Sequence, residues 1–230
     1  MSSPLRAMLH ATWVLLRKEL LVELRTGEIV VTTGLFATLV AVLTSLAFYL
    51  DAQRAQALAP GVLWIALVFA GVLAMGRSWS RERDHDVFRA LLLSPVPRTA
   101  IYASKLLSSV LFLLVVELLL VLEVTVLFNL TLTGVVWPLC ALLVLGTIGF
   151  AATGNLFAAL AVRTRGREML LSVALLPVVA PALLAGVVGT RELLVGAPLS
   201  DVYGFMQLLG AADLAFLAAG FTLFEPLVSD

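Results

Sequence analysis

The chain has 230 residues, of which 61% are hydrophobic and 13% charged, and its mean hydropathy is +1.08. A soluble domain is far less apolar, so this composition indicates a protein that crosses a membrane several times. The 15 basic residues balance the 15 acidic ones, so no overall positive field favours nucleic acid as a partner. Cys140 is the single cysteine, which excludes an intrachain disulfide and a cysteine-ligated metal site, and we expect it to be buried.

Residues 1–28 lack the uninterrupted apolar core of a cleavable signal peptide. Apolar residues recur there every three or four positions, which predicts an amphipathic cytoplasmic helix lying along the membrane interface. Glu23 interrupts this apolar stripe, which consists of Leu5, Leu9, Trp13, Leu16, Leu20 and Leu24. Two interpretations stay open, because the helix could pack against the protein's own spans or could sense lipid.

Six apolar runs predict six transmembrane helices, so residues 29–230 form one all-α transmembrane domain. The expected spans are about 29–50, 61–75, 100–128, 135–162, 169–188 and 202–224. Pro60 should start the second span, and Trp64 should anchor it near the membrane interface. The segment 191–200 is too short to span and too apolar for a simple loop, so we expect it to be partly re-entrant or interfacial.

The densest charge cluster begins at Arg77 and forms a loop over residues 77–98. A charge at the centre of a membrane helix costs roughly 2.5–3.5 kcal/mol, so this cluster should lie in water between the second and third spans. Mixed charges precede a leucine triplet and two prolines, which favours a short amphipathic helix gripped by a soluble partner over a plain solvated connector. The residues expected to act there are Arg81, Glu82, Arg83, Asp84, Asp86, Leu91 and Leu92.

Orientation follows from the basic residues, because lysine and arginine accumulate in cytoplasmic loops. All but two of the 15 basic residues fall on one side of the predicted spans, and the exceptions are Arg54 and Arg191. The N-terminus and the loop at 77–98 are therefore expected in the cytoplasm. Six spans return the C-terminus to the same side.

The chain has no phosphate-binding loop for ATP. Its two lysines, Lys18 and Lys105, do not follow a glycine, so the Gly-Lys-Ser/Thr motif is absent. If ATP powers transport through this chain, a separate subunit must hydrolyse it and must bind at the cytoplasmic face. No cluster of nucleophile, base and ligand residues indicates an enzyme, and no catalytic or metal site is expected.

Three segments carry a resemblance to a known family. Residues 81–108, RERDHDVFRALLLSPVPRTAIYASKLLS, resemble the coupling-helix loop of ABC-2 type permeases, and more closely that of heme exporter protein B of cytochrome c maturation, the CcmB family. Residues 23–28 and 58–79 are similar to that family too. The resemblance implies a permease subunit in the bacterial inner membrane, with a separate ABC ATPase subunit that binds ATP. Other membrane subunits that handle heme and a periplasmic heme chaperone are further implied partners.

Heme enters this interpretation as cargo, and no cofactor is expected on the chain itself. His10 and His85 are the only histidines, and both fall on the predicted cytoplasmic side, away from the face that would deliver heme. One alternative is a permease for another amphiphile such as a lipid, a polysaccharide or a drug. A second is a membrane scaffold without a conformational cycle. The complex could hold two copies of the chain, as a homodimer, or one copy beside a different membrane subunit.

Three acids fall within predicted spans: Glu117, Glu123 and Asp213. An ionisable group at membrane depth must face the protein interior, a cavity or a partner, so these acids should line a transport pathway or a subunit interface. The run of small residues from 146 to 161 allows helices to approach closely, which predicts tight packing of spans and, as a second hypothesis, an oligomer interface.

Overall fold

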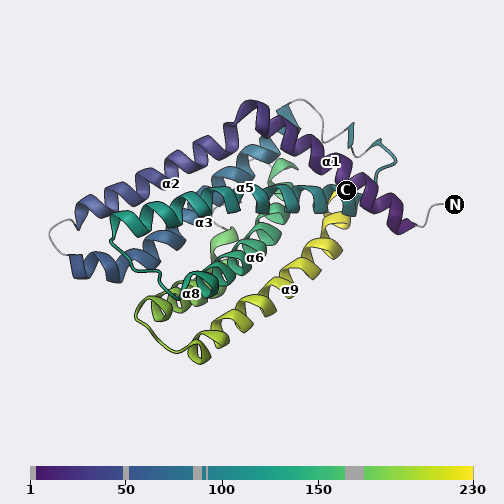
Figure 1. Ribbon diagram of the computed structural model, residues 1–230. Helices are drawn as coiled ribbons and strands as arrows, with labels where there is room; N and C mark the ends of the chain where they lie inside the picture. Colours follow the sequence, from purple (N-terminus) through teal and green to yellow (C-terminus); the bar gives the residue numbers. More distant parts are fainter. Residues whose placement is uncertain (1–3, 49–51, 85–89, 92, 164–173, 230) are drawn as a thin grey trace.

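The structure is a computed structural model that describes residues 4–48, 52–84, 90–91, 93–163 and 174–229. Within these residues every regular element is helical (Figure 1). The long helices are α1 (Pro4–Thr26), α2 (Glu28–Ala47), α3 (Ala52–Asp84), α5 (Arg98–Leu127), α6 (Val136–Arg163), α8 (Leu175–Leu194) and α9 (Leu199–Ser229).

Within the described ranges, six of these helices, all except α1, are long and apolar enough to cross a membrane. This confirms the predicted all-α fold with six spans after an N-terminal helix. The two ends of the bundle differ in the segments that meet there (Figure 1). One end, called the charged end below, gathers α1, the end of α3, the start of α5 and the end of α9. At the opposite end, called the far end, α2 leads to α3, α5 to α6, and α8 to α9.

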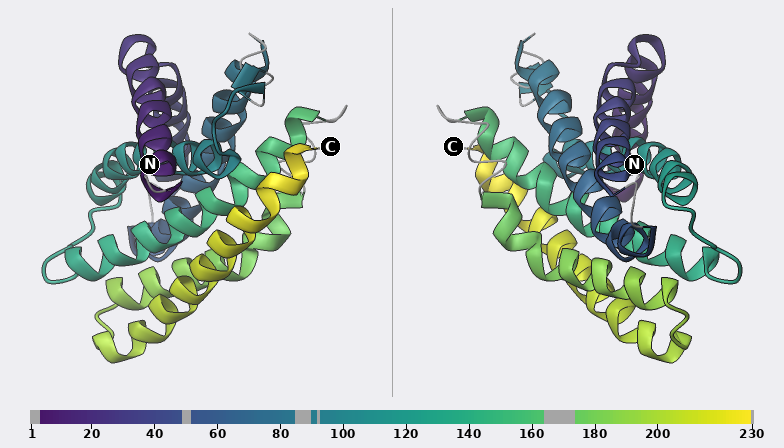
Figure 2. Two further views of the ribbon diagram at one scale, coloured as in Figure 1. Left: turned by 90° about the vertical axis from the view of Figure 1, so that its right-hand side faces the viewer. Right: turned by 90° about the vertical axis from the view of Figure 1, so that its left-hand side faces the viewer.

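Figure 2 (left) views the charged end directly and shows α1 and the end of α9 on opposite sides of it. Helix α3 packs against α2, α5, α6 and α8 and is the most buried of the six spans. In its membrane-crossing stretch 67% of the residues are buried, against 22% for α9. One buried cluster of apolar side chains lies around Trp79 and Phe224 near the charged end, and a second surrounds Trp64 towards the far end.

Trp64 is buried rather than anchored at the membrane interface, so that prediction is wrong. Its side chain is 1% exposed, and its indole Nε1 donates a hydrogen bond of 2.9 Å to Thr190 Oγ1. The ring lies against Gly146 and Gly186, where an added Cβ would overlap it. This slot, between glycines of two different helices, confirms the predicted close packing of the small-residue run.

Two predicted boundaries are also wrong. Helix α3 begins at Ala52, so Pro60 lies inside the helix rather than at its start. The re-entrant form expected of segment 191–200 is not found, because α8 continues to Leu194 and a tight turn leads directly to α9, while an interfacial position stays a prediction. Gly196 has a φ of 81° there, and the pair of hydrogen bonds from Gly196 N to Leu193 O and from Ala197 N to Glu192 O closes the helix in a Schellman motif. Cys140 is exposed on α6 rather than buried.

Candidate functional site

Helix α1 turns acidic residues towards the bundle. Glu19 and Glu23 are each 5% exposed, and Leu16 beside them is buried as well. Much of the predicted apolar stripe faces outward instead, at Leu5, Leu9, Trp13 and Leu24. The glutamate that interrupts the stripe in the sequence is therefore a contact with the protein. The structure favours packing of α1 on the protein's own spans, which is the first of the two interpretations above.

Four buried or half-buried charges form a closed ring of alternating sign, called the charge ring below. Lys18 and Glu19 come from α1, Glu82 from the end of α3 and Lys105 from the start of α5. Lys105 Nζ lies 2.9 Å from Glu19 Oε1 and 2.9 Å from Glu82 Oε1. Lys18 Nζ completes the ring at 3.0 Å from Glu19 and 2.5 Å from Glu82. Each charge thus has two neighbours of opposite sign.

The charge ring is held in a largely dry environment. The side chains of Glu82 and Lys105 are each 3% exposed, and Lys105 also donates to Ser78 Oγ at 3.2 Å. Its ammonium lies 5.7 Å from the centre of the Trp79 ring, within range of a cation–π contact. Burial lowers the pKa of Lys18, but the two neighbouring glutamates outweigh burial and hold this pKa above its ordinary value. Lys18 therefore stays charged at neutral pH.

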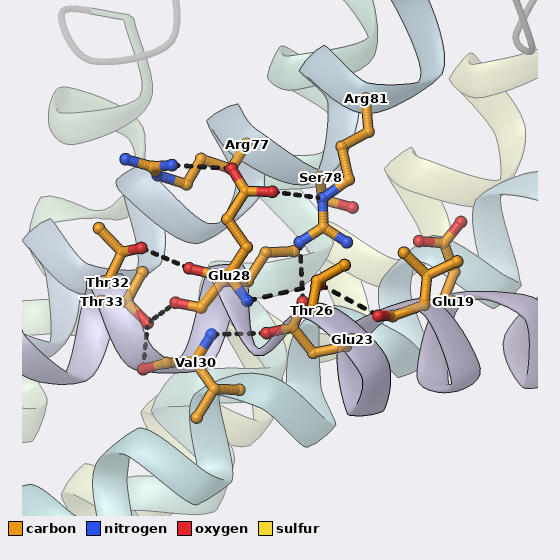
Figure 3. A network of polar contacts seen from close by, with 12 residues as sticks. Glu19, Glu23, Thr26, Glu28, Val30, Thr32, Thr33, Arg77, Ser78 and Arg81 are labelled. Atoms are coloured by element: carbon orange, nitrogen blue, oxygen red, sulfur yellow. Dashed lines mark hydrogen bonds and ion pairs between the residues drawn. The ribbon is translucent and has the colours of Figure 1, made fainter. Parts of the chain in front are cut away.

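A second group of charges fixes the corner between α1 and α2 (Figure 3). Arg81 pairs with Glu23 at 2.7 Å and lies 3.5 Å from Glu28, which pairs with Arg77 at 2.9 Å. Gly27 makes the corner with a φ of 61°, a left-handed conformation that suits glycine. The other oxygen of Glu23 accepts a hydrogen bond of 2.8 Å from the backbone N–H of Val30, in the first turn of α2.

Because these ion pairs are buried, the loss of one partner should strongly destabilise the protein. Removing one partner of a buried ion pair typically costs about 3–5 kcal/mol, because the remaining charge is left uncompensated. The network is not fully satisfied, since Oε2 of Glu82 and two guanidinium nitrogens of Arg81 are buried without a hydrogen-bond partner. Unpaired buried groups are rare and call for an explanation. Both side chains are nevertheless ion-paired through other contacts, Glu82 with two lysines and Arg81 with two glutamates.

The charge ring borders both sides of the predicted coupling loop. Glu82 lies two residues before the end of α3, and Lys105 lies two turns into α5. Within the loop, Leu91 and Val96 are half-buried and pack against the apolar core. The hydroxyl of Ser94 donates to the carbonyl of Leu91 at 2.7 Å. Leu91 thus packs against the core as expected of the leucine triplet, whereas Leu93 of the same triplet is 83% exposed, so the coupling role of this loop stays a prediction.

The placement of several predicted coupling residues differs from the expectation. Arg81 and Glu82 were expected in water, but they lie in α3 and pair with glutamates and lysines inside the protein. That part of the prediction is wrong, because ion pairs with α1 and α5 hold these side chains inside the protein. Asp86 and Leu92 lie outside the described residues, as do the side chains of Arg83 and Asp84, so their contact with a partner stays a prediction.

A polar chain continues from the charge ring into the bundle. Trp79 Nε1 donates to Asn155 Oδ1 at 2.9 Å, and Asn155 Nδ2 donates to Ser109 Oγ at 3.0 Å. These contacts join α3, α6 and α5. The ends of the coupling loop are thereby linked to the centre of the bundle through specific hydrogen bonds.

The three acids within the spans occupy separate sites. Glu117 is 4% exposed and accepts a hydrogen bond of 3.1 Å from Thr147 of α6. Glu123 accepts one of 2.7 Å from Thr38 of α2. Asp213 is 6% exposed and lies against Gly149. Buried oxygens of Glu123 and Asp213 have no hydrogen-bond partner, so a role in a pathway or at a subunit interface stays a prediction.

Sequence reasoning did not assign a role to five members of the site, namely Lys18, Glu19, Glu23, Glu28 and Lys105. A signal was present, because Glu19 and Glu23 are four residues apart and therefore share a helix face. Lys105 falls inside a predicted span, where a buried cation requires an acidic partner. Among the described residues, no three histidine, cysteine, aspartate or glutamate side chains are grouped closely enough to hold a metal ion.

Fold and site together define a multi-pass membrane protein whose N-terminal helix is ion-paired to the base of one loop. The family model described as CcmB protein matches residues 10–224, so the chain belongs to the CcmB family. Over 211 residues it is 28% identical to heme exporter protein B of Bradyrhizobium diazoefficiens, which covers 90% of this chain and 91% of the relative. It is 32% identical over 163 residues to heme exporter protein B of Paracoccus denitrificans, covering 70% of this chain and 72% of the relative. The expected resemblance is confirmed.

Proposed function

We propose that this chain is the membrane subunit of an ABC-type heme exporter of the bacterial inner membrane. In this proposal the charged end faces the cytoplasm, where a separate ATPase subunit presses on the loop between α3 and α5. The result is release of heme to a periplasmic chaperone for cytochrome c maturation. Membership of the CcmB family and the name of both relatives support heme as cargo.

The observation that carries the proposal is the position of the charge ring. It ties both flanks of the loop, at Glu82 and Lys105, to Glu19 of α1. A flexible loop in water would bend when the ATPase subunit presses on it, and the helices would not move. Here a push on the loop must instead move the ends of α3, α5 and α1 together, or break buried ion pairs.

Helix α3 provides the route to the opposite membrane face. It runs from the coupling loop to the far end and contacts four other spans along its length. Packed helices behave as rigid elements, so a movement of α3 at Asp84 should also move its other end, at the far end of the bundle. In this proposal the ion pairs of Glu82 and Arg81 rearrange when the helices shift, and their buried atoms without a hydrogen bond take up new contacts.

The test uses the assembled complex, with its ATPase subunit and the heme acceptor, in lipid vesicles. Glu82→Gln removes one charge from the ring without changing the volume of the side chain. We expect ATP hydrolysis to continue while heme release falls at least tenfold, because the push no longer reaches α1. Arg77→Gln is the matched control on the same helix, since its ion pair with Glu28 is exposed, and it should leave both rates nearly unchanged.

Three results would contradict the proposal. Unchanged heme release in Glu82→Gln would remove the role of the charge ring in coupling. A complex purified without an ATPase subunit would favour the scaffold alternative. Transport of a different amphiphile, with no heme retained or released, would reassign the cargo. Mass measurement of the same complex decides between two copies of the chain and one copy beside a different subunit.

A further inference from the structure

A cavity of about 450 Å³ opens at the far end of the bundle. It is lined by the start of α3, by the connection between α5 and α6, and by the end of α8, which lie at the left of Figure 1. These segments are distant in the sequence, so the cavity is a product of the fold. Small-molecule sites typically measure about 300–1,000 Å³, which places this cavity in the range of a ligand site.

The lining is amphiphilic. Pro60 and Leu194 contribute apolar surface, while Gln56, Asn129 and Thr131 contribute amide and hydroxyl groups. The neighbouring space, which shares Pro60 and Leu194 and reaches further into the bundle, has a volume of only about 10 Å³. The cavity therefore narrows towards the core, which suits a binding pocket better than the mouth of a pore.

Arg191 supplies the charge. It is the one ionisable side chain among the described lining residues, and no ion pair or side-chain hydrogen bond engages it in the part of the chain that the structure describes. Basic residues are depleted on this side of the spans, where Arg54 is the only other one. An unpaired guanidinium beside an apolar wall is suited to a carboxylate or phosphate, which it can bind through two parallel hydrogen bonds.

Two walls of the cavity are fixed by hydrogen bonds. Gln56 Nε2 donates to the carbonyl of Asn129 at 3.1 Å, and Leu130 N donates to Thr125 O at 2.9 Å. Asn129 has a φ of 50°, a left-handed conformation that asparagine tolerates better than most residues. Arg191 lies in the last turn of α8, which the Schellman motif closes. A preformed pocket loses little entropy on binding.

We propose that this cavity binds an amphiphile with a carboxylate or phosphate head, which pairs with Arg191 while its apolar part lies against Pro60 and Leu194. Two sources carry this chemistry: a porphyrin with free carboxylates, and an anionic lipid of the adjacent leaflet. The choice of a porphyrin rests on the proposed heme cargo, but binding at the far end is measured without the ATPase and is therefore tested separately from ATP-driven release.

The experiment titrates the full chain, in nanodiscs of neutral phosphatidylcholine, with protoporphyrin IX and with its dimethyl ester, followed by porphyrin fluorescence. The free acid should bind at least tenfold more tightly than the ester. Arg191→Gln should abolish this difference, and Arg191→Lys should retain part of it. Arg54→Gln is the matched control and should behave as the unaltered chain. Phosphatidylglycerol in the nanodisc should compete for the site if the source is lipid, and should not compete if the source is the porphyrin.

Ala57→Trp gives a second test, because Ala57 lines the cavity and an indole would fill it while leaving Arg191 in place. Binding should fall although the charge is retained. The proposal is overturned if neither probe binds, if acid and ester bind equally, if Arg54→Gln has the effect of Arg191→Gln, or if Ala57→Trp binds normally. Loss of ATP-driven heme release would leave all of these binding results unchanged.

Discussion

The two ends of the bundle use charge in opposite ways. At the charged end, eight charged side chains from α1, α2, α3 and α5 pair with one another. At the far end, Arg191 lines a cavity without a partner among the described residues. Internal pairing joins helices into one mechanical unit, whereas an unpaired charge is available to a ligand. The ion pairs of the charged end are what the proposed coupling requires, and the unpaired charge of the far end is what the proposed binding requires.

The comparison predicts that the buried pairs dominate stability. Lys105→Met should lower the free energy of unfolding by about 3–5 kcal/mol, because Glu19 and Glu82 lose their most buried partner. Denaturant titration in detergent measures this change. Lys18→Met is the matched control in the same ring, since the side chain of Lys18 is 38% exposed and water can replace part of its contacts. A loss for Lys105→Met no larger than for this control would show that the ring is not a buried network.

A paired substitution sharpens the same point. Glu82→Gln combined with Lys105→Met removes one charge of each sign and leaves the Lys18–Glu19 pair balanced. The double variant should be less destabilised than the sum of the single variants, with a coupling energy of roughly 0.5–3 kcal/mol. The double-mutant cycle, measured by the same titration, checks this value. Strict additivity would mean that the two side chains act independently despite their 2.9 Å contact.

Hydropathy was sufficient to predict the six spans, because each apolar helix must satisfy its backbone groups internally in lipid. Hydropathy could not predict the charge ring, because the ring depends on contacts between distant parts of the chain. Its ion pair between Lys18 and Glu82, for example, joins residues 64 positions apart. The density of charges at residues 77–98 predicted exposure to water, but Arg81 and Glu82 form ion pairs with α1 and α5 instead. The cavity was equally unpredictable, because three separate segments form it.

The end of α8 shows a different kind of failure. Gly196 followed by Ala197 and Pro198 is a readable signal for a helix end and a turn. The apolar residues around it suggested membrane depth instead. In the structure the same residues form the rim of the far end, and Val195 is exposed. Local turn chemistry was the better guide here than hydropathy.

The far half of the bundle should be sensitive to packing rather than to charge. Gly146→Ala places a methyl group into the ring of Trp64, and such overpacking typically costs about 1–3 kcal/mol. Gly210→Ala on α9 is the matched control, because an added Cβ there meets no atom within 4 Å. Thermal unfolding in detergent distinguishes the two variants. Equal stability would contradict the role assigned to the slot around Trp64.

The smallest effect is expected at the exposed edge of the charged end. The side chains of Arg77 and Glu28 are 41% and 47% exposed, so their pair should contribute only about 0–1 kcal/mol. Arg77→Gln should lower stability by that amount at low ionic strength and by almost nothing in 1 M salt, where the screening length falls to about 3 Å. Lys105→Met should stay equally destabilising in both conditions, because the side chains of Lys105 and of the two glutamates that it pairs with are at most 7% exposed. Parallel denaturant titrations at the two salt concentrations measure both variants, and a common salt response would show that water penetrates the charge ring as freely as it does the surface.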